Sequence, residues 1–146
     1  MNVTENRVIV PGWFWIVSVL ALLWELVGIA AYLKQVTQTA AEVAALPPAQ
    51  QALLSATPPW VTGAFAIAVF SGGLAATAML LRRKWCRLFY VVSVVAAIAQ
   101  FGWVFGVAKA HETIGQSAIY LPATVIAIGL LLVWLAGIAI KKGWLR

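Results

Sequence analysis

The fold is decided by the stretch from Gly12 to Leu33, which reads GWFWIVSVLALLWELVGIAAYL. Glu25 is the only formally charged side chain in these 22 residues, and the apolar run is too long for a buried strand. A helix of about 20 apolar residues crosses the roughly 30 Å hydrocarbon core of a bilayer and satisfies its backbone polar groups internally. The stretch therefore predicts a transmembrane helix.

Three further runs have the same character and extend over Trp60 to Leu81, Leu88 to Ala108 and Ile119 to Ile140. None of them contains a formally charged side chain. Of all 146 residues, 64% are hydrophobic and 10% are charged, which excludes a soluble globular domain. We predict an all-α integral membrane protein, a four-transmembrane-helix bundle that forms a single membrane domain over residues 1–146.

The basic residues are distributed unevenly between the two ends of the predicted bundle. Eight of the ten fall at one end, namely Arg7, Arg82, Arg83, Lys84, Arg87, Lys141, Lys142 and Arg146. Lys34 and Lys109 are the two at the other end. Because Lys- and Arg-rich flanks are retained in the cytoplasm, both termini are expected there. The clusters lie beside the membrane and form no single patch, so the expected partner is the lipid bilayer and no nucleic acid is expected.

Tryptophans gather near the predicted span ends, where aromatic side chains favour the headgroup region. Trp13, Trp60, Trp85 and Trp144 occupy such positions, whereas Trp24, Trp103 and Trp134 lie deeper. Ligand stacking is the alternative role, and it suits only the deeper set.

The first outer loop, residues 34–59, is the one sizeable polar segment. Pro48 favours a helix start, good helix formers follow it, and Pro58 favours a stop. We expect a short amphipathic helix on the outer surface, whose leucines cap the bundle or form a lid over a substrate path.

A shifted self-comparison indicates two duplicated hairpins. With a shift of 75, Ser18 aligns with Ser93, Glu25 with Gln100 and Lys34 with Lys109. With a shift of 59, Arg82 and Arg83 align with Lys141 and Lys142, and Trp85 aligns with Trp144. Such a parallel repeat is known in membrane proteins, and chance matching among Ala, Val and Ile is the alternative.

This alignment also predicts a polar pair. Counted from the starts of their helices, Glu25 and Gln100 have nearly equal depth at 1.5 Å per residue, so the two side chains are expected to meet. The candidate residues for binding a substrate or ion are Glu25, Gln100, Trp24, Trp103, Ser18, Ser93 and Tyr32. A stripe of small residues on the second helix, Ala64, Ala68, Gly72 and Ala76, predicts close helix packing.

Glu25 admits two roles. A carboxylate in hydrocarbon costs at least about 2.5 to 3.5 kcal/mol on insertion scales, so it is expected inside the bundle, hydrogen-bonded or protonated. If the protonated carboxyl shares a hydrogen bond with Gln100, Glu25 is a structural clamp between helices. If the carboxyl faces a water-filled cavity, Glu25 binds a cation or exchanges protons during transport.

The sequence does not indicate a metal, haem, disulfide or catalytic site. His111 and Cys86 are the only histidine and cysteine, so neither a metal site nor a haem or disulfide is expected within one chain. The sequence also lacks a nucleophile with its base, so we expect no enzyme and no cofactor.

Two resemblances bear on function. The segment Leu22-Leu23-Trp24-Glu25-Leu26-Val27-Gly28, followed by Lys34, resembles the first helix of small multidrug resistance transporters. These transporters also have four spans, and the resemblance implies that Glu25 exchanges protons for cationic drugs. The likeness is confined to the first helix, and that family's third-helix Trp-Ser-Gly pattern is absent.

Over nearly its full length the chain is similar to small bacterial four-span inner-membrane proteins often labelled sugar transporter. The motifs that carry this likeness are Pro11-Gly12-Trp13-Phe14-Trp15, Leu46-Pro47-Pro48-Ala49-Gln50-Gln51-Ala52-Leu53, Thr57-Pro58-Pro59-Trp60 and Lys142-Gly143-Trp144-Leu145-Arg146. The resemblance implies the inner membrane and the topology, and no sugar-binding motif carries over.

Two functions follow as expectations. The first is a transport-like protein in which Glu25 couples protons or cations to the movement of a small solute such as a sugar. It would work as a homo-oligomer, because four helices are too few to enclose a path. The alternative is a non-catalytic accessory or assembly subunit that packs against a larger membrane complex.

Overall fold

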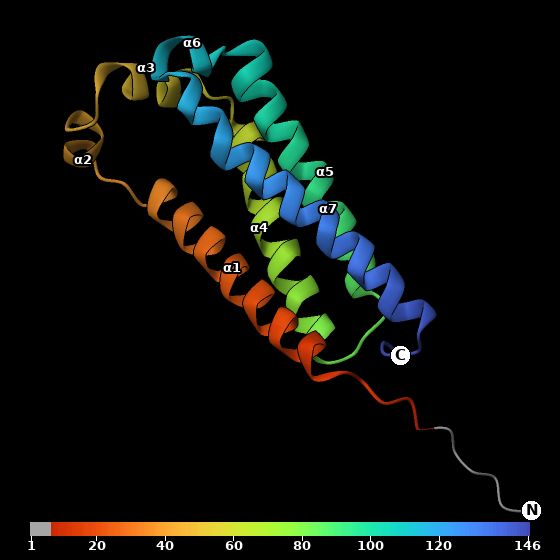
Figure 1. The fold of residues 1–146 in the computed structure, drawn as a ribbon. Coiled ribbons are helices and arrows are strands. Elements are labelled where there is room, and N and C mark those ends of the chain that lie inside the picture. Colours follow the sequence, from red (N-terminus) through yellow and green to blue (C-terminus); the bar gives the residue numbers. More distant parts are fainter. Residues whose placement is uncertain (1–6) are drawn as a thin grey trace, which may run out of the picture.

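The computed structural model describes residues 7–146, and the expected cytoplasmic position of the first six residues lies outside them. Four long apolar helices confirm the four predicted spans (Figure 1). They are α1 (Gly12–Val36), α4 (Pro59–Leu80), α5 (Cys86–Gly102) and α7 (Tyr120–Lys141). A π-helical turn, η1 (Trp103–Val107), extends α5, and a 3₁₀ turn, η2 (Gln116–Ile119), precedes α7. The described residues form no strand, and the chain is a multi-pass membrane protein by the length and hydropathy of these helices.

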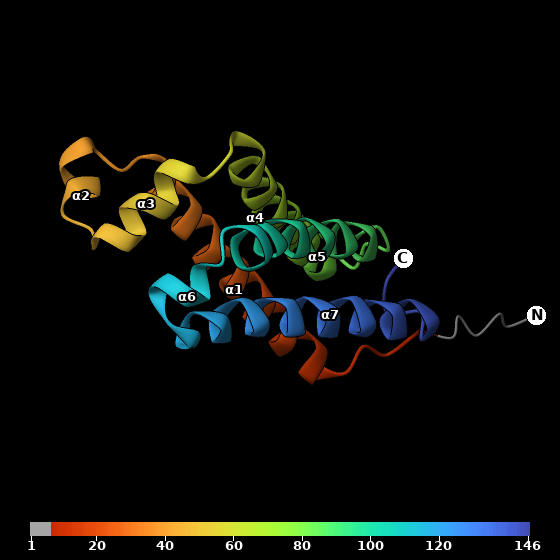
Figure 2. The same cartoon turned by 90° about the horizontal axis from the view of Figure 1, so that it is seen from above.

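By their contacts, the long helices are neighbours in the order α1, α4, α5, α7. Figure 2 shows α5 and α7 running side by side. The second helix, α4, lies between α1 and α5, and its many small residues allow both to approach closely. Its buried residues include the predicted packing positions Ala68, Gly72 and Ala76, while Ala64 is half-buried. Packed pairs form between α1 and α4 and between α5 and α7; their descent from one duplicated hairpin stays a prediction.

The larger of two clusters of buried apolar residues lies toward the end of the bundle that carries the eight basic residues. The C-terminal segment after α7 folds back there, and Arg146 N–H donates to the Arg82 carbonyl at 2.6 Å. Arg82 in turn donates from Nε to the Trp144 carbonyl at 2.7 Å. The Trp144 ring lies 5.5 Å from Trp13 and 5.6 Å from Phe14, both edge-on. Trp144 is a core residue, whereas Trp13, Trp60 and Trp85 are exposed. The headgroup depth expected for all four tryptophans stays a prediction.

A hydrogen bond from Ser93 joins α5 to α4 inside the apolar interior. The Ser93 hydroxyl donates to the Ala68 carbonyl at 2.7 Å. We expect Ser93→Ala to lower the free energy of unfolding by about 0.6 and at most about 1.7 kcal/mol, the range for such bonds in membrane proteins. Ser18→Ala is the control, because the Ser18 hydroxyl bonds only to Phe14 of its own helix. Equal losses in both variants would contradict an interhelical contribution.

Two short helices, α2 (Ala40–Ala44) and α3 (Pro48–Ala56), occupy the segment between α1 and α4. The Gln51 amide joins them by donating to the Ala44 and Leu46 carbonyls at 3.1 and 2.7 Å. A third short helix, α6 (Ala110–Ile114), lies in the segment before α7 and contacts α3. These elements cover the end of the bundle opposite the basic residues (Figure 1).

A capping box starts α2 and makes its stability depend on pH. The Thr39 backbone N–H and hydroxyl both donate to Glu42 Oε2, at 2.7 and 2.9 Å. The backbone bond, then the hydroxyl, holds the pKa of the Glu42 carboxyl below its ordinary value. Because the pKa is lowered in the folded segment, the stabilisation is full at neutral pH and is lost as the pH falls through the lowered value.

We therefore expect amide exchange in α2 to be slow at neutral pH and to accelerate on acidification. Site-resolved hydrogen exchange across a pH series measures this directly, after correction for intrinsic exchange rates. In Glu42→Gln the pH dependence should disappear, because glutamine does not titrate. An acid-dependent opening that persists in this variant would contradict the assignment.

Candidate functional site

The predicted polar stripe of the first helix lies against α4. Ser18 and Ala21 are buried, and Glu25, Gly28 and Tyr32 are half-buried. Gly28 brings α1 close to α4, since a Cβ there would lie 3.2 Å from Val69 Cγ1. Further out, the Tyr32 ring packs edge-on to Phe65 at 5.4 Å. The α1–α4 interface is thus closely packed above and below Glu25.

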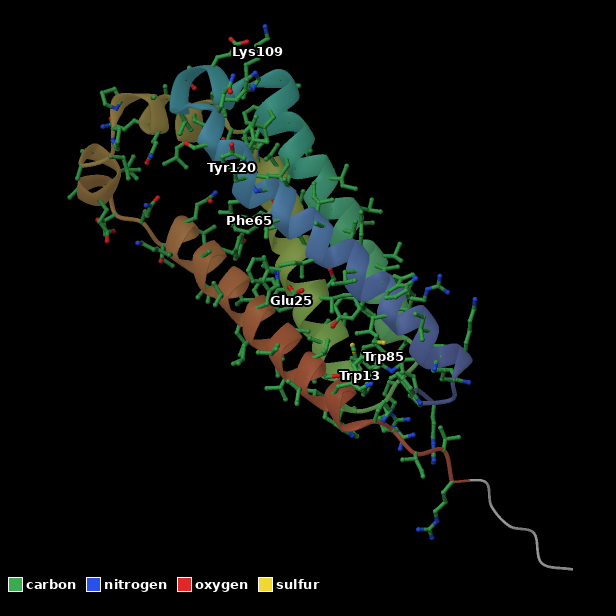
Figure 3. The ribbon with its side chains drawn as sticks, in the orientation of Figure 1. Trp13, Glu25, Phe65, Trp85, Lys109 and Tyr120 are labelled. Atoms are coloured by element: carbon green, nitrogen blue, oxygen red, sulfur yellow. The ribbon has the colours of Figure 1, made fainter. Side chains whose placement is uncertain are left out.

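Glu25 itself rests on a glycine of α4 (Figure 3). A Cβ built on Gly72 would overlap Oε2 and would lie 2.6 Å from Cδ and 2.9 Å from Oε1. The carboxyl therefore fills the space that a side chain at position 72 would occupy. Gly72 was predicted as a helix-packing position, and its absent side chain makes room for a polar group.

No cation neutralises this carboxyl among the described residues. The ion pairs of residues 7–146 are those of Glu112, with Lys109 at 3.7 Å and His111 at 3.9 Å, both far along the chain from Glu25. The hydroxyl of the buried Tyr90 donates to Met79 Sδ at 3.7 Å. Glu25 is thus a single carboxyl in an apolar interface.

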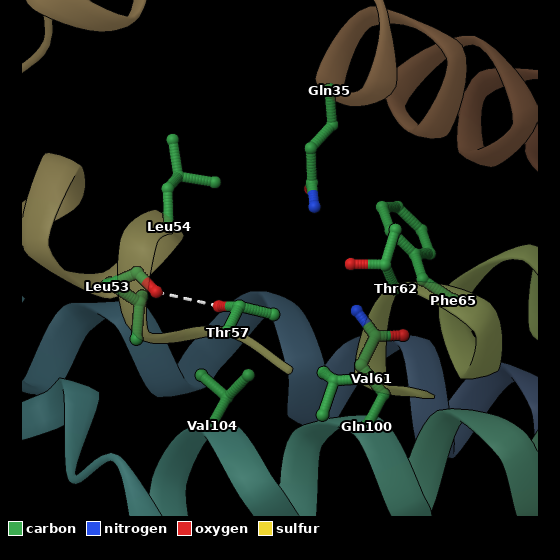
Figure 4. A pocket seen from close by; sticks show the side chains of 9 residues that line it. All are labelled: Gln35, Leu53, Leu54, Thr57, Val61, Thr62, Phe65, Gln100 and Val104. Atoms are coloured by element: carbon green, nitrogen blue, oxygen red, sulfur yellow. Dashed lines mark hydrogen bonds between the residues drawn. The ribbon is translucent and has the colours of Figure 1, made fainter. Parts of the chain in front are cut away.

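Gln100 does not join Glu25, contrary to the expected pairing. It lines a cavity of about 100 Å³, together with Gln35 of α1 and Thr62 of α4 (Figure 4). We call this the outer cavity, because it lies at the end of the bundle that α3 covers, away from the eight basic residues. The α4 residues of this cavity run from Val61 to Phe65, whereas Glu25 contacts Gly72. Seven or more residues along α4 correspond to about 10 Å or more. Glu25 and Gln100 therefore lie at different heights along α4, and α4 separates the two helices that carry them.

The other candidate residues either form hydrogen bonds with the backbone or lie away from the cavity beside Gln100. The hydroxyls of Ser18 and Ser93 each donate to a backbone carbonyl, at 2.7 Å in both cases. Trp24 and Trp103 are half-buried, and neither lines the outer cavity beside Gln100. The structure therefore does not bring Trp24, Glu25, Gln100 and Trp103 together into one sugar-binding surface.

A second cavity was not predicted from the sequence. An apolar groove of about 450 Å³ runs between the parts of α5 and α7 that lie nearer to α6, and His111 of α6 lines it. From the sequence, His111 was expected to be an isolated loop residue. Its position beside α5 and α7 depends on how the loop folds, which the sequence pattern does not show. Among residues 7–146 no three His, Cys, Asp or Glu side chains form a metal-binding group.

No protein family, characterised protein sequence or solved structure matches this chain.

Proposed function

We propose that this chain is a transport-like protein of the bacterial inner membrane, in which Glu25 couples protons or cations to the movement of a small polar solute. The observation that carries the proposal is the unpaired Glu25 carboxyl on Gly72, within a membrane-spanning interface. Ionisable groups in such positions are expensive and commonly serve ion or proton pathways. The proposed orientation has the eight basic residues of one end, and both termini, in the cytoplasm.

The first helix connects Glu25 to the outer cavity. Among the long helices α1 packs along α4, and it carries both Glu25 and the cavity-lining Gln35. In the α1–α4 contact near Glu25, side chains fit onto glycines of the facing helix, with Val69 on Gly28 and Ile29 on Gly73 beside Glu25 on Gly72. Loading Glu25 with a proton or cation changes its interaction with α4, and a resulting shift of α1 would move Gln35 at the cavity.

The size of the outer cavity restricts the solute. About 100 Å³ holds roughly three water molecules, at about 30 Å³ each, and is smaller than the usual 300–1,000 Å³ of ligand sites. A sugar would therefore enter only after α1 moved outward. In this proposal α3 lies on the outer membrane surface as a cap over that opening, and a homo-oligomer completes the path.

Proton-coupled uptake into proteoliposomes tests the proposal. With a pH-sensitive dye inside, we expect a panel of hexoses and small organic cations to include a solute that drives proton movement in the wild type. Glu25→Gln should reduce this movement at least tenfold, because glutamine cannot carry the proton. Glu112→Gln is the matched control, a carboxyl-to-amide change in an outer loop.

Equal proton movement in the Glu25→Gln variant and the wild type would contradict the coupling role. Glu25 would then be a clamp between α1 and α4. If, in addition, the protein purified from native membranes with a larger complex, the accessory-subunit alternative would apply.

A further inference from the structure

The end of the bundle that carries the eight basic residues has no acidic side chain among residues 7–146. Glu42 and Glu112 lie in the short helices α2 and α6 at the opposite end, and Glu25 lies in the middle of α1 (Figures 1 and 3). The one other glutamate of the sequence balances at most one of the eight charges. Most of the positive charge at this end is therefore left for groups outside the chain to balance.

Arg87 is held in the seam between α5 and α7. A Cβ at Gly137 of α7 would lie 3.5 Å from both Cζ and Nε of Arg87, so the guanidinium lies over this glycine. Two turns further along α5, Val94 lies over Gly129 of α7 in the same way. Arg87 thus occupies a packing position of the seam, and it is nevertheless exposed and forms no ion pair within residues 7–146.

The side chains around this position suit a phospholipid. Lys141 lies one turn from Gly137 on the same face of α7 and is exposed. Trp134 lies three residues from Gly137 in the other direction, and Val91 lies one turn beyond Arg87 on α5; both are exposed apolar side chains. The seam therefore presents two cations at the ends of the spans, followed by an apolar surface at the depth of the acyl chains.

We propose that Arg87 and Lys141 bind the phosphate of an anionic phospholipid, whose acyl chains lie along Val91 and Trp134. A guanidinium donates two parallel hydrogen bonds to phosphate oxygens, and the lysine adds a second positive charge. Basic pockets between transmembrane helices bind anionic headgroups in this manner. A zwitterionic headgroup is disfavoured, because its ammonium group would meet the same unbalanced positive charge. The site is independent of Glu25 and of the proposed coupling.

Two simpler roles do not account for the placement of Arg87. Orientation of the spans requires basic residues near their cytoplasmic ends, but it does not require a guanidinium over a glycine of another helix. A purely structural arginine is exemplified by Arg82, whose Nε donates to the Trp144 carbonyl at 2.7 Å. The exposed guanidinium of Arg87 instead remains open to a phosphate at the membrane surface.

The test is a titration of the detergent-solubilised full chain with phosphatidylglycerol or with phosphatidylethanolamine of the same acyl chains, followed by native mass spectrometry. Arg87→Gln combined with Lys141→Gln removes the two proposed phosphate ligands. Arg83→Gln combined with Lys142→Gln is the matched control, because it removes the same charge from two exposed residues at the same end. The Lys142 ammonium lies 5.3 Å from the centre of the Trp144 ring, at the folded-back C-terminal segment.

Gly137→Leu separates position from charge. It keeps every basic residue, and its side chain takes the place of the Arg87 guanidinium in the seam. We expect this variant to bind phosphatidylglycerol several-fold more weakly than the wild type, with the helical content by circular dichroism unchanged. Undiminished binding by a folded Gly137→Leu variant would overturn the proposed site.

We expect the wild type to bind one phosphatidylglycerol per chain saturably, at least tenfold more tightly than phosphatidylethanolamine. The Arg87 and Lys141 double variant should lose this preference, and the control should keep its affinity within about twofold. Equal losses in the two double variants, or equal affinities of the wild type for the two lipids, would overturn the proposal and leave the basic residues as orientation signals. Displacement of the lipid by inorganic phosphate would also overturn it and would assign the site to a soluble anion.

Discussion

Replacing Gly72 with alanine is expected to lower the free energy of unfolding by about 1–3 kcal/mol, because the new methyl group overlaps the Glu25 carboxyl. The three atoms nearest to that methyl group all belong to Glu25, so the carboxyl must leave its place on α4. Unfolding by a denaturing detergent in mixed micelles measures the loss.

Gly63 provides the matched control on the same helix. A Cβ at Gly63 meets no atom within 4 Å, so Gly63→Ala should be neutral or stabilising by up to about 1 kcal/mol through helix propensity. Because the overlap at Gly72 involves Glu25, Glu25→Ala combined with Gly72→Ala should recover most of the loss. Equal stabilities of the two glycine variants would contradict the described contact.

The second large effect is expected at the folded-back C-terminus. Trp144 is 8% exposed and packs on Trp13 and Phe14, so Trp144→Ala should cost about 3–5 kcal/mol through the cavity it creates. Thermal unfolding in lipid nanodiscs gives the comparison with the wild type.

Trp134→Ala is the control for this change, because Trp134 is 62% exposed on the lipid-facing side of α7. Its loss should be below about 1 kcal/mol, since the removed ring contacts acyl chains and few protein atoms. Similar losses for the two tryptophans would contradict the packing role described for Trp144.

The four spans could be predicted because hydropathy over some 20 residues is sufficient to define a membrane helix. The first helix was expected to begin at Gly12 and does so, and it continues to Val36. The polar stripe from Ser18 to Tyr32 could also be placed on one face, because spacings of three and four residues fix the face of a helix.

The pairing of Glu25 with Gln100 could not be predicted, because depth counted along each helix ignores which helices are neighbours. With α4 between α1 and α5, equal depth does not bring the two side chains together. The same limit applies to Trp144 and His111, whose surroundings are made by segments distant in sequence. Arg82 illustrates this, since its bond to the Trp144 carbonyl joins residues 62 positions apart.

Glu25 is the residue on which the proposed function depends, and infrared difference spectroscopy of the protein in lipid tests it most directly. The carboxyl stretch is followed against pH, with Glu25→Gln as the reference. Proton exchange at Glu25 predicts a band that changes over the physiological pH range and is missing from the variant. Identical pH difference spectra of the wild type and Glu25→Gln would contradict it and would leave Glu25 as a structural clamp on Gly72.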